Sequence, residues 1–282
     1  MKAIKKISII RPLNLALTFT AVLLGGYLFF LQGAPFHYLR VMIAAISACC
    51  VAAGAYMLND VHDVVEDKIN AANRAAPSEK LSAPLLLKTG WLFLVIGIII
   101  SFFLAMIQGL FVIIIVLLLL LYVYKLKSLP LIGNVVAALC AALTFPFGAL
   151  ADGAVSAGII PALLAFPVHL AREIVKDVED IKGDRAAGLV TLPILFSPEI
   201  AIRISGFIMI ITAMVIPIPY FTGDLGLIYL LIAGILTAIP LAYWGGGAIA
   251  FPVNISSGKL QLGLKWIMLP GMAAILTGMM WN

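Results

Sequence analysis

Long apolar runs, separated by short polar segments, dominate this sequence of 282 residues. A helix needs roughly 20 consecutive apolar residues to cross a bilayer. We therefore predict an all-α polytopic membrane protein that forms one domain over residues 1–282. Its nine transmembrane helices are expected at about 13–32, 38–58, 84–107, 109–124, 132–151, 157–175, 200–219, 225–246 and 260–281.

Composition supports this prediction, because 63% of the residues are hydrophobic and only 11% are charged. A soluble domain has roughly 45–50% apolar and about 25% charged residues. The first apolar run follows a basic N-terminus and resembles a signal peptide. It is longer than a typical signal core and lacks a clear cleavage site, so we predict a retained first helix.

The distribution of basic residues predicts the orientation in the membrane. If the N-terminus is cytoplasmic, 17 of the 18 Lys and Arg residues lie on the cytoplasmic side, and only Arg40 lies outside. Cytoplasmic segments are enriched in Lys and Arg, so this orientation is favoured. We expect a multi-pass protein of the cell membrane with its C-terminus outside. The net charge of +5 then belongs to the cytoplasmic face, and no nucleic-acid partner is indicated.

The acidic residues form two clusters with the same spacing. Eleven of the 13 lie within 60–79 or 173–199, and both segments follow predicted helices at the cytoplasmic side. Each cluster contains the pattern D-x2-D-x3-D, formed by Asp60, Asp63 and Asp67 in the first and by Asp177, Asp180 and Asp184 in the second. Offsets of three and seven place three carboxylates on one helical face. The repetition suggests a pseudo-repeat of helix groups, the first four helices against the next four.

Three carboxylates on one face repel one another unless cations compensate them. Two such faces opposed across a cavity would suit Mg²⁺, which binds one or two carboxylates together with substrate phosphates and waters. Basic residues accompany the acids, namely Arg74, Lys125, Lys127 and Lys176. Acids and bases together predict a site for a metal-bridged phosphate. For Lys125 and Lys127, membrane anchoring is an alternative role.

Several motifs carry a resemblance to a known family. They are N-D-x-x-D-x-x-x-D at 59–67, I-N-x-x-N-R-x-x-P-S at 69–78, and K-D-V-E-D-I-K-G-D at 176–184 with a trailing T-L-P. On these motifs the sequence resembles the UbiA superfamily of intramembrane prenyltransferases. The string around the second cluster is most similar to archaeal digeranylgeranylglyceryl phosphate synthases.

The resemblance implies nine helices around a central cavity and a Mg²⁺-dependent transferase of alkyl groups other than methyl. It implies that the six clustered aspartates hold Mg²⁺ and that other residues contact substrate: Asn59, Arg74, Lys176, Arg11, Asn14, Tyr122, Tyr124, Lys125 and Lys127. The family's Y-x-x-x-K pattern is not matched at 122–127, where Tyr122 can pair with Lys125 or Lys127, or Tyr124 with Lys127.

The implied function is transfer of a prenyl group, such as geranylgeranyl, from its diphosphate to a membrane-associated lipid acceptor. The subfamily resemblance implies geranylgeranylglyceryl phosphate as acceptor, in archaeal phospholipid biosynthesis. Its phosphate needs a basic contact, for which Arg11, Lys125 and Lys127 are candidates. Alternatives are an aromatic acceptor, as in quinone, tocopherol or chlorophyll synthesis, and an ion-coupled transporter. Neither His62 nor His169 stands out as a general base.

Overall fold

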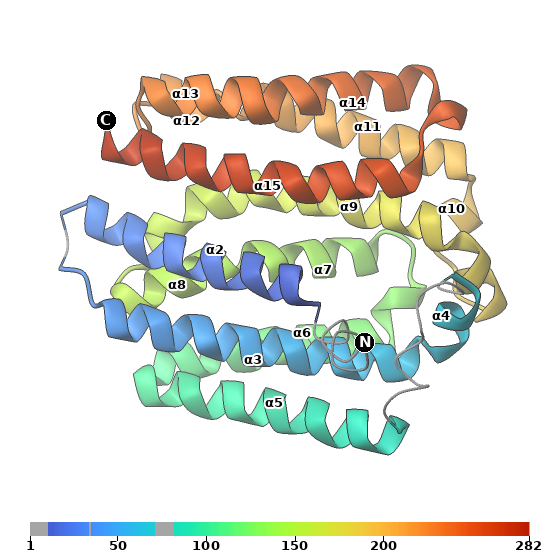
Figure 1. Cartoon of the computed structure of the whole chain (residues 1–282), viewed down its shortest axis with the longest axis horizontal. Coiled ribbons are helices and arrows are strands. Elements are labelled where there is room, and N and C mark those ends of the chain that lie inside the picture. Colours follow the sequence, from blue (N-terminus) through green and yellow to red (C-terminus); the bar gives the residue numbers. More distant parts are fainter. Residues whose placement is uncertain (1–10, 34, 71–81, 282) are drawn as a thin grey trace, which may run out of the picture.

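The computed structural model describes residues 11–33, 35–70 and 82–281. Within these ranges, nine helical segments are long and apolar enough to cross a membrane, and every regular element is a helix. The segments run side by side along the long axis of the molecule (Figure 1). The prediction of an all-α polytopic protein is therefore confirmed.

Seven of the nine spans lie in one main helix each. These are α2 (Pro12–Leu31), α3 (Tyr38–His62), α5 (Ala83–Leu104), α6 (Met106–Tyr124), α9 (Ile159–Ala186), α11 (Pro198–Val215) and α15 (Ser257–Met280). The other two are interrupted: α7 (Ile132–Ala142) with α8 (Thr144–Asp152), and α13 (Leu227–Ala233) with α14 (Ile239–Ala250), between which lies a π-helical segment, Gly234–Ala238. Short helices are α4 (Val64–Asn70), α10 (Leu192–Leu195) and α12 (Ile218–Phe221), with 3₁₀ turns at Leu126–Ser128, Val155–Gly158 and Pro252–Asn254.

Two spans differ from the sequence prediction in a way that shapes the site. The fifth breaks at Leu143, because Pro146 has no N–H to donate and its ring crowds the carbonyl of Ala142. The sixth continues beyond the predicted end at 175, so that α9 extends to Ala186. The second acidic cluster therefore lies on a continuous helix and not in a loop.

The outer surface consists largely of apolar side chains. Phe103, Leu163, Met214 and Tyr243 are among the large side chains that are exposed. Contiguous apolar surface of this kind is unusual on a soluble monomer but suits contact with lipid chains. The chain is an integral membrane protein.

Helices α2 and α8 cross so closely that their backbones touch. A Cβ atom at Gly25 would collide with the backbone of Phe145, and one at Gly148 would collide with the backbone of Val22. Small residues permit such crossings between membrane helices. The two helices form part of the wall of the interior cavity described below.

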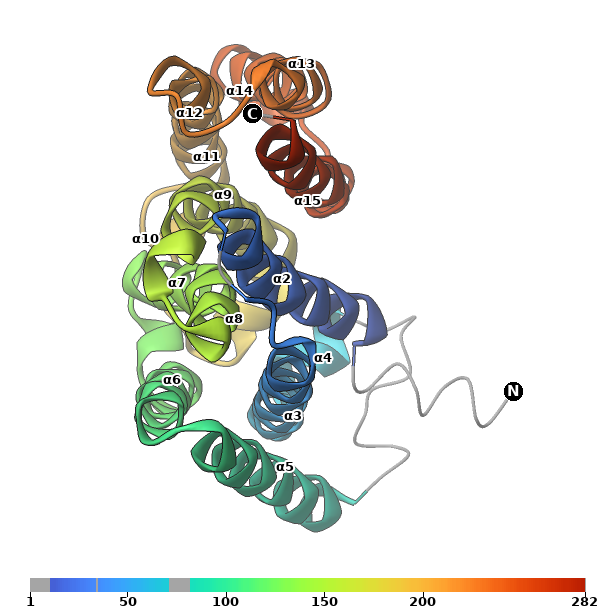
Figure 2. The same ribbon diagram turned by 90° about the vertical axis from the view of Figure 1, so that its left-hand side faces the viewer.

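The helices are grouped about this interior. Seen along the bundle, α11 to α15 gather on one side, and α5 and α6 lie on the opposite side (Figure 2). Helix α4 packs against α9, and both meet at the end of the bundle opposite the C-terminal end of α15 (Figure 1). The two acidic clusters are thus brought to the same end.

Candidate active site

The first acidic cluster does not lie on one continuous helix. Helix α3 ends at His62, Asp63 forms a turn whose N–H donates to the carbonyl of Asn59, and α4 begins at Val64. The prediction of a single helical face is therefore wrong for this cluster. It holds for the second cluster, whose three aspartates all lie on α9. The break lets α4 turn toward α9.

Asn70 joins the two acidic segments. Its Nδ2 donates to the backbone oxygen of Asp180 at 2.8 Å, and its Oδ1 accepts the N–H of Gly183, also at 2.8 Å. A Cβ at position 183 would collide with the Asn70 side chain and with the Glu66 backbone. Glycine at 183 is therefore what allows α4 to approach the helix that carries the second cluster.

Carboxylates of the first cluster pair with cations from elsewhere in the chain. Arg11 donates from Nη2 to Asp60 Oδ1 at 2.7 Å. Lys127 donates from Nζ to Asp63 Oδ1 at 2.5 Å and to Glu66 Oε1 at 3.1 Å. Asp60, Asp63 and Glu66 are all buried, and buried carboxylates require such partners.

The second cluster is partnered in a similar way. Asn134 of α7 donates from Nδ2 to Asp177 Oδ2 at 2.8 Å. Lys176 lies 3.4 Å from Asp180 on the same helix. Asp184 is buried and lies within electrostatic range of Lys127, which links the two clusters. Lys127 therefore sits between carboxylates of both segments.

Arg11 combines two interactions at the start of α2. Besides its bond to Asp60, its guanidinium lies 4.9 Å from the centre of the Tyr56 ring, a cation–π distance. Burial lowers the pKa of Arg11, but the charge and hydrogen bond of Asp60 together with Tyr56 and Asp63 outweigh burial, and the net pKa lies above its ordinary value. The side chain is therefore held as a cation beside the first cluster.

The donor set can be compared with what Mg²⁺ requires. Among the described residues, no group of three or more His, Cys, Asp or Glu side chains is assembled as a metal site. Mg²⁺ needs only one or two carboxylates, because phosphate oxygens and waters complete its shell. Hard carboxylate oxygens from two segments that face each other fit this ion. The six predicted metal ligands remain a prediction.

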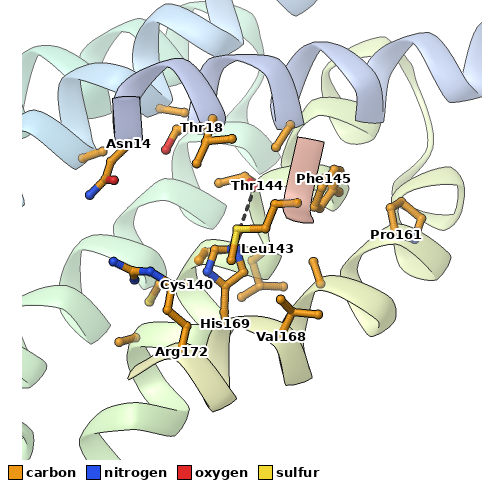
Figure 3. A pocket seen from close by; sticks show the side chains of 18 of the residues that line it. Asn14, Thr18, Cys140, Leu143, Thr144, Phe145, Pro161, Val168, His169 and Arg172 are labelled. Atoms are coloured by element: carbon orange, nitrogen blue, oxygen red, sulfur yellow. Dashed lines mark hydrogen bonds between the residues drawn. The ribbon is translucent and has the colours of Figure 1, made fainter. Parts of the chain in front are cut away.

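An interior cavity of about 310 Å³ opens beside the clusters. At its polar end the lining includes Arg11, Asn14, Asn59, Tyr122 and Lys176. Figure 3 shows Asn14 and Arg172 on one side of the view, His169 beside Arg172, and the apolar side chains of Val168, Phe145 and Pro161 farther along. The cavity follows α9 from Pro161 to Lys176, about 22 Å along the helix axis.

The structure places the tyrosines and lysines at 122–127 in different surroundings. Tyr122 lines the cavity, and Lys127 contacts the first cluster. Tyr124 is half exposed, its ring 4.6 Å from that of His62, and Lys125 is exposed. Two other predicted site features, the side chain of Asp67 and all of Arg74, lie outside the described residues.

The structure adds residues that the sequence prediction did not assign to the site. They are Glu66, Asn70, Asn134, Arg172, Glu173 and Lys265. Polar residues inside membrane spans are costly, and this cost is itself a signal of function. That signal was present for Asn134 and Lys265, each a polar residue within a predicted apolar run.

These features define a polytopic membrane protein with a charged site at the mouth of an apolar interior. The model of the UbiA prenyltransferase family matches residues 17–247. The chain belongs to this family, which confirms the resemblance seen in the sequence, and it is an intramembrane prenyltransferase.

Curated relatives and solved structures agree with this assignment. Digeranylgeranylglyceryl phosphate synthase of Methanosphaera stadtmanae is 33% identical over 226 residues, 80% of this chain and 81% of that protein. The synthase of Methanopyrus kandleri is 31% identical and covers 96% of this chain and 97% of its own. A solved structure of a digeranylgeranylglyceryl phosphate synthase matches with a TM-score of 0.75 at 27% identity, covering 100% of this chain and 99% of that one. The fold is also that of a UbiA homologue from Aeropyrum pernix, with a TM-score of 0.72, 16% identity and coverage of 92% and 98%.

Proposed function

We propose that this protein transfers a geranylgeranyl group from its diphosphate to the free hydroxyl of geranylgeranylglyceryl phosphate. The hydroxyl oxygen forms a bond to the first carbon of the prenyl chain. The bond from that carbon to the diphosphate oxygen breaks, and the diphosphate leaves with the electron pair. The hydroxyl proton departs with the inorganic diphosphate, so atoms and charge balance.

One observation carries the proposal: two acidic segments and their cations converge at the mouth of a long apolar cavity. The mouth carries both signs of charge: Lys127 pairs with Asp63 and Glu66, and Lys176 pairs with Asp180. Such a mixed-charge mouth suits a metal-bridged diphosphate. The apolar lining accommodates the prenyl chain and excludes water from the reacting carbon.

Magnesium is part of the proposal. Bound by the aspartates of both clusters, it would supply charge stabilisation to the diphosphate as the carbon–oxygen bond breaks. Lys176, Lys127 and Arg11 would orient the diphosphate and neutralise its remaining charge. Tyr122, which lines the cavity close to Lys176, would shield the allylic carbon with its ring.

The acceptor is inferred from the relatives, whose names state a digeranylgeranylglyceryl phosphate product. The shape of the cavity supports a lipid, since the cavity follows α9 for about 22 Å and is apolar away from its charged end. An aromatic acceptor remains the alternative within the same family, and the experiment below distinguishes the two.

We also propose that the charged end of the bundle faces the cytoplasm. Helix α4 and the end of α9 that it packs against lie at this end, and the C-terminal end of α15 lies at the other (Figure 1). The excess of Lys and Arg in the segments on the charged side supports this orientation. Cysteine labelling from either side of sealed vesicles would test it.

The proposed reaction is tested with purified protein, labelled geranylgeranyl diphosphate, Mg²⁺ and a panel of acceptors. We expect a labelled product with geranylgeranylglyceryl phosphate, and its loss when EDTA is added. Asp63→Ala and Asp180→Ala should each lower the rate by about 10²-fold or more, since each removes a proposed ligand of the Mg²⁺ that would stabilise the leaving diphosphate. Asp224→Ala is the matched control, because Asp224 is exposed and the one hydrogen bond of its carboxylate in the described structure is accepted from Thr222.

Two outcomes would contradict the proposal in different ways. Transfer to an aromatic acceptor but not to the phospholipid would show that the acceptor is wrong and the reaction type right. Intact diphosphate with every acceptor would contradict prenyl transfer by this protein altogether.

A further inference from the structure

We infer that Arg172 and Lys265 form a second anion site in the cavity, which binds the phosphate of the acceptor lipid. This inference rests on the proposed function, because it assigns the phosphate of the acceptor and not the diphosphate of the donor. It replaces the sequence-based candidates for that contact, Arg11, Lys125 and Lys127.

The guanidinium of Arg172 is held by two hydrogen bonds and retains an unused donor. Its guanidinium donates from Nη1 to Glu173 at 2.5 Å and from Nη2 to Gln261 Oε1 at 3.2 Å. Gln261 in turn donates to Glu179 Oε2 at 2.8 Å, so the contact between α9 and α15 fixes the arginine from both sides. Arg172 Nε is buried and has no hydrogen-bond partner in the described part of the chain. The side chain lines the cavity and is a preorganised donor.

Lys265 brings a second positive charge to the same place. It lies on α15 one helical turn after Gln261, and it lines the cavity. Lys265 is close enough to Arg172 and Arg11 to feel their like charges. None of the ion pairs found among the described residues includes Lys265. Glu173, which pairs with Arg172, is the one carboxylate that acts on Lys265 from nearby. A cation inside a membrane span is costly, and a bound anion reduces that cost.

This pair is separate from the cations that accompany the acidic clusters. Arg172 lies four residues before Lys176, about 6 Å farther along α9 away from Asp180. Arg11 and Lys127 are engaged with Asp60 and Asp63, and Lys125 is exposed. A metal-bridged diphosphate fits the acidic mouth, with its several carboxylates. A metal-free phosphate monoester fits Arg172 and Lys265, where Glu173 is the one nearby carboxylate and is paired with Arg172.

Positioning by the phosphate also explains how a flexible lipid is oriented. A phosphate monoester carries close to two negative charges at neutral pH and has three acceptor oxygens. Held by Arg172 and Lys265, it would leave the neighbouring glycerol hydroxyl free to face the polar end of the cavity. The prenyl chain of the acceptor would then follow the apolar lining contributed by Val168, Ile267 and Met268.

The test uses the purified protein and two measurements. Initial rates give separate KM values for geranylgeranyl diphosphate and geranylgeranylglyceryl phosphate. Direct binding of geranylgeranylglyceryl phosphate, without donor or Mg²⁺, provides a readout that does not depend on turnover. We expect Lys265→Gln to raise both the acceptor KM and the acceptor Kd about tenfold or more, and to change the donor KM less than about twofold. Lys265→Arg should restore binding. Arg172→Lys, which keeps the charge but loses the planar fork, should weaken acceptor binding as well.

Matched controls separate a phosphate contact from a general effect. Lys259→Gln makes the same charge change on the same helix, but Lys259 is exposed and does not line the cavity. The dephosphorylated lipid, geranylgeranylglycerol, should bind the wild-type protein about as weakly as geranylgeranylglyceryl phosphate binds Lys265→Gln.

Equal effects of Lys265→Gln on donor and acceptor KM would overturn the inference, as would equal wild-type binding of the lipid with and without phosphate. If the wild-type protein transfers the prenyl group only to other acceptors, the proposed function fails. Binding without donor then still decides whether a phosphate lipid occupies this site.

Discussion

Lys127 Nζ lies 2.5 Å from Asp63 Oδ1. A cation just after α6 therefore neutralises an acid just after α3. The same ammonium reaches Glu66 at 3.1 Å. Asn59 donates from Nδ2 to the other carboxylate oxygen of Asp63, and the pair of Lys127 and Asp63 is mostly shielded from solvent. Lys127 thus acts as an internal counterion for a cluster that is expected to receive Mg²⁺ and diphosphate.

Replacement of this counterion should reduce stability when divalent ions are absent. Lys127→Met leaves Asp63 and Glu66 without a cation, which should cost about 1–3 kcal/mol. The apparent Tm in detergent should fall by roughly 2–4 °C for each kcal/mol. Addition of Mg²⁺ with inorganic diphosphate should recover part of the loss. Lys125→Met is the control, and an equal fall there would show that the ion pair is not responsible.

The close approach of α4 to α9 predicts a strong effect of a single methyl group. Gly183→Ala places a Cβ against the Asn70 side chain and should separate the acidic segments. We expect a loss of stability of about 1–3 kcal/mol together with a higher Mg²⁺ requirement for transfer. Gly246→Ala, on α14 with open space around the position, should be neutral or slightly stabilising. Unchanged Mg²⁺ dependence in Gly183→Ala would argue against this role of the contact.

The planar guanidinium of Arg11 predicts that lysine cannot replace it. Arg11→Lys keeps the charge near Asp60 but loses the stacking over Tyr56. A loss of about 0.5–2 kcal/mol would raise the donor KM by roughly twofold to thirtyfold. Arg40→Lys is a suitable comparison, because Arg40 bonds the carbonyl of Leu104 away from the clusters. Equal KM values for the Arg11 variant and the wild type would remove Arg11 from the donor site.

At the other end of the bundle, one carboxylate joins two helices. Asp152 Oδ1 accepts the backbone N–H of His37 at 2.8 Å and lies 3.0 Å from its Nδ1. Asp152→Ala removes both contacts and should cost about 1–3 kcal/mol, whereas His37→Ala retains the backbone bond and should cost about 0.5–1.5 kcal/mol. Apparent Tm values should show this order while transfer kinetics stay unchanged. The reverse order of stability would show that the side-chain contact dominates.

The sequence predicted the spans well, because twenty apolar residues in a row have few other uses. It did not predict the break at Leu143 or the length of α9. Pro146 lies inside an apolar run, so hydropathy does not reveal the break before it. The residues of α9 after 175 are mostly charged, so a prediction based on hydropathy assigns them to a loop. In this protein the last turns of α9 are held by neighbouring helices: Asn70 of α4 bonds the backbone of Asp180 and Gly183, and Asn134 of α7 bonds the carboxylate of Asp177.

The acidic clusters could be recognised from spacing alone, but their partners could not. A helix that is apolar on nearly all sides has no polar stripe to fix its rotation about its axis. The facing of Asn134 toward Asp177, or of Lys265 toward Arg172, depends on that rotation. Similarly, Asn70 was visible within a motif, yet its role follows only from the position of Gly183 on another helix.

Helix α9 carries the apolar wall at Pro161, the cation at Arg172 and the acids at 177–184 on one uninterrupted axis. Their separations are therefore set by the rise of about 1.5 Å per residue and cannot vary independently. Insertion of one residue between Arg172 and Asp177 would rotate everything beyond it by about 100°. Helix α9 therefore fixes the distances between the apolar wall, the cation and the acids. A site for a longer or shorter substrate would have to differ in the neighbouring helices and not in α9 itself.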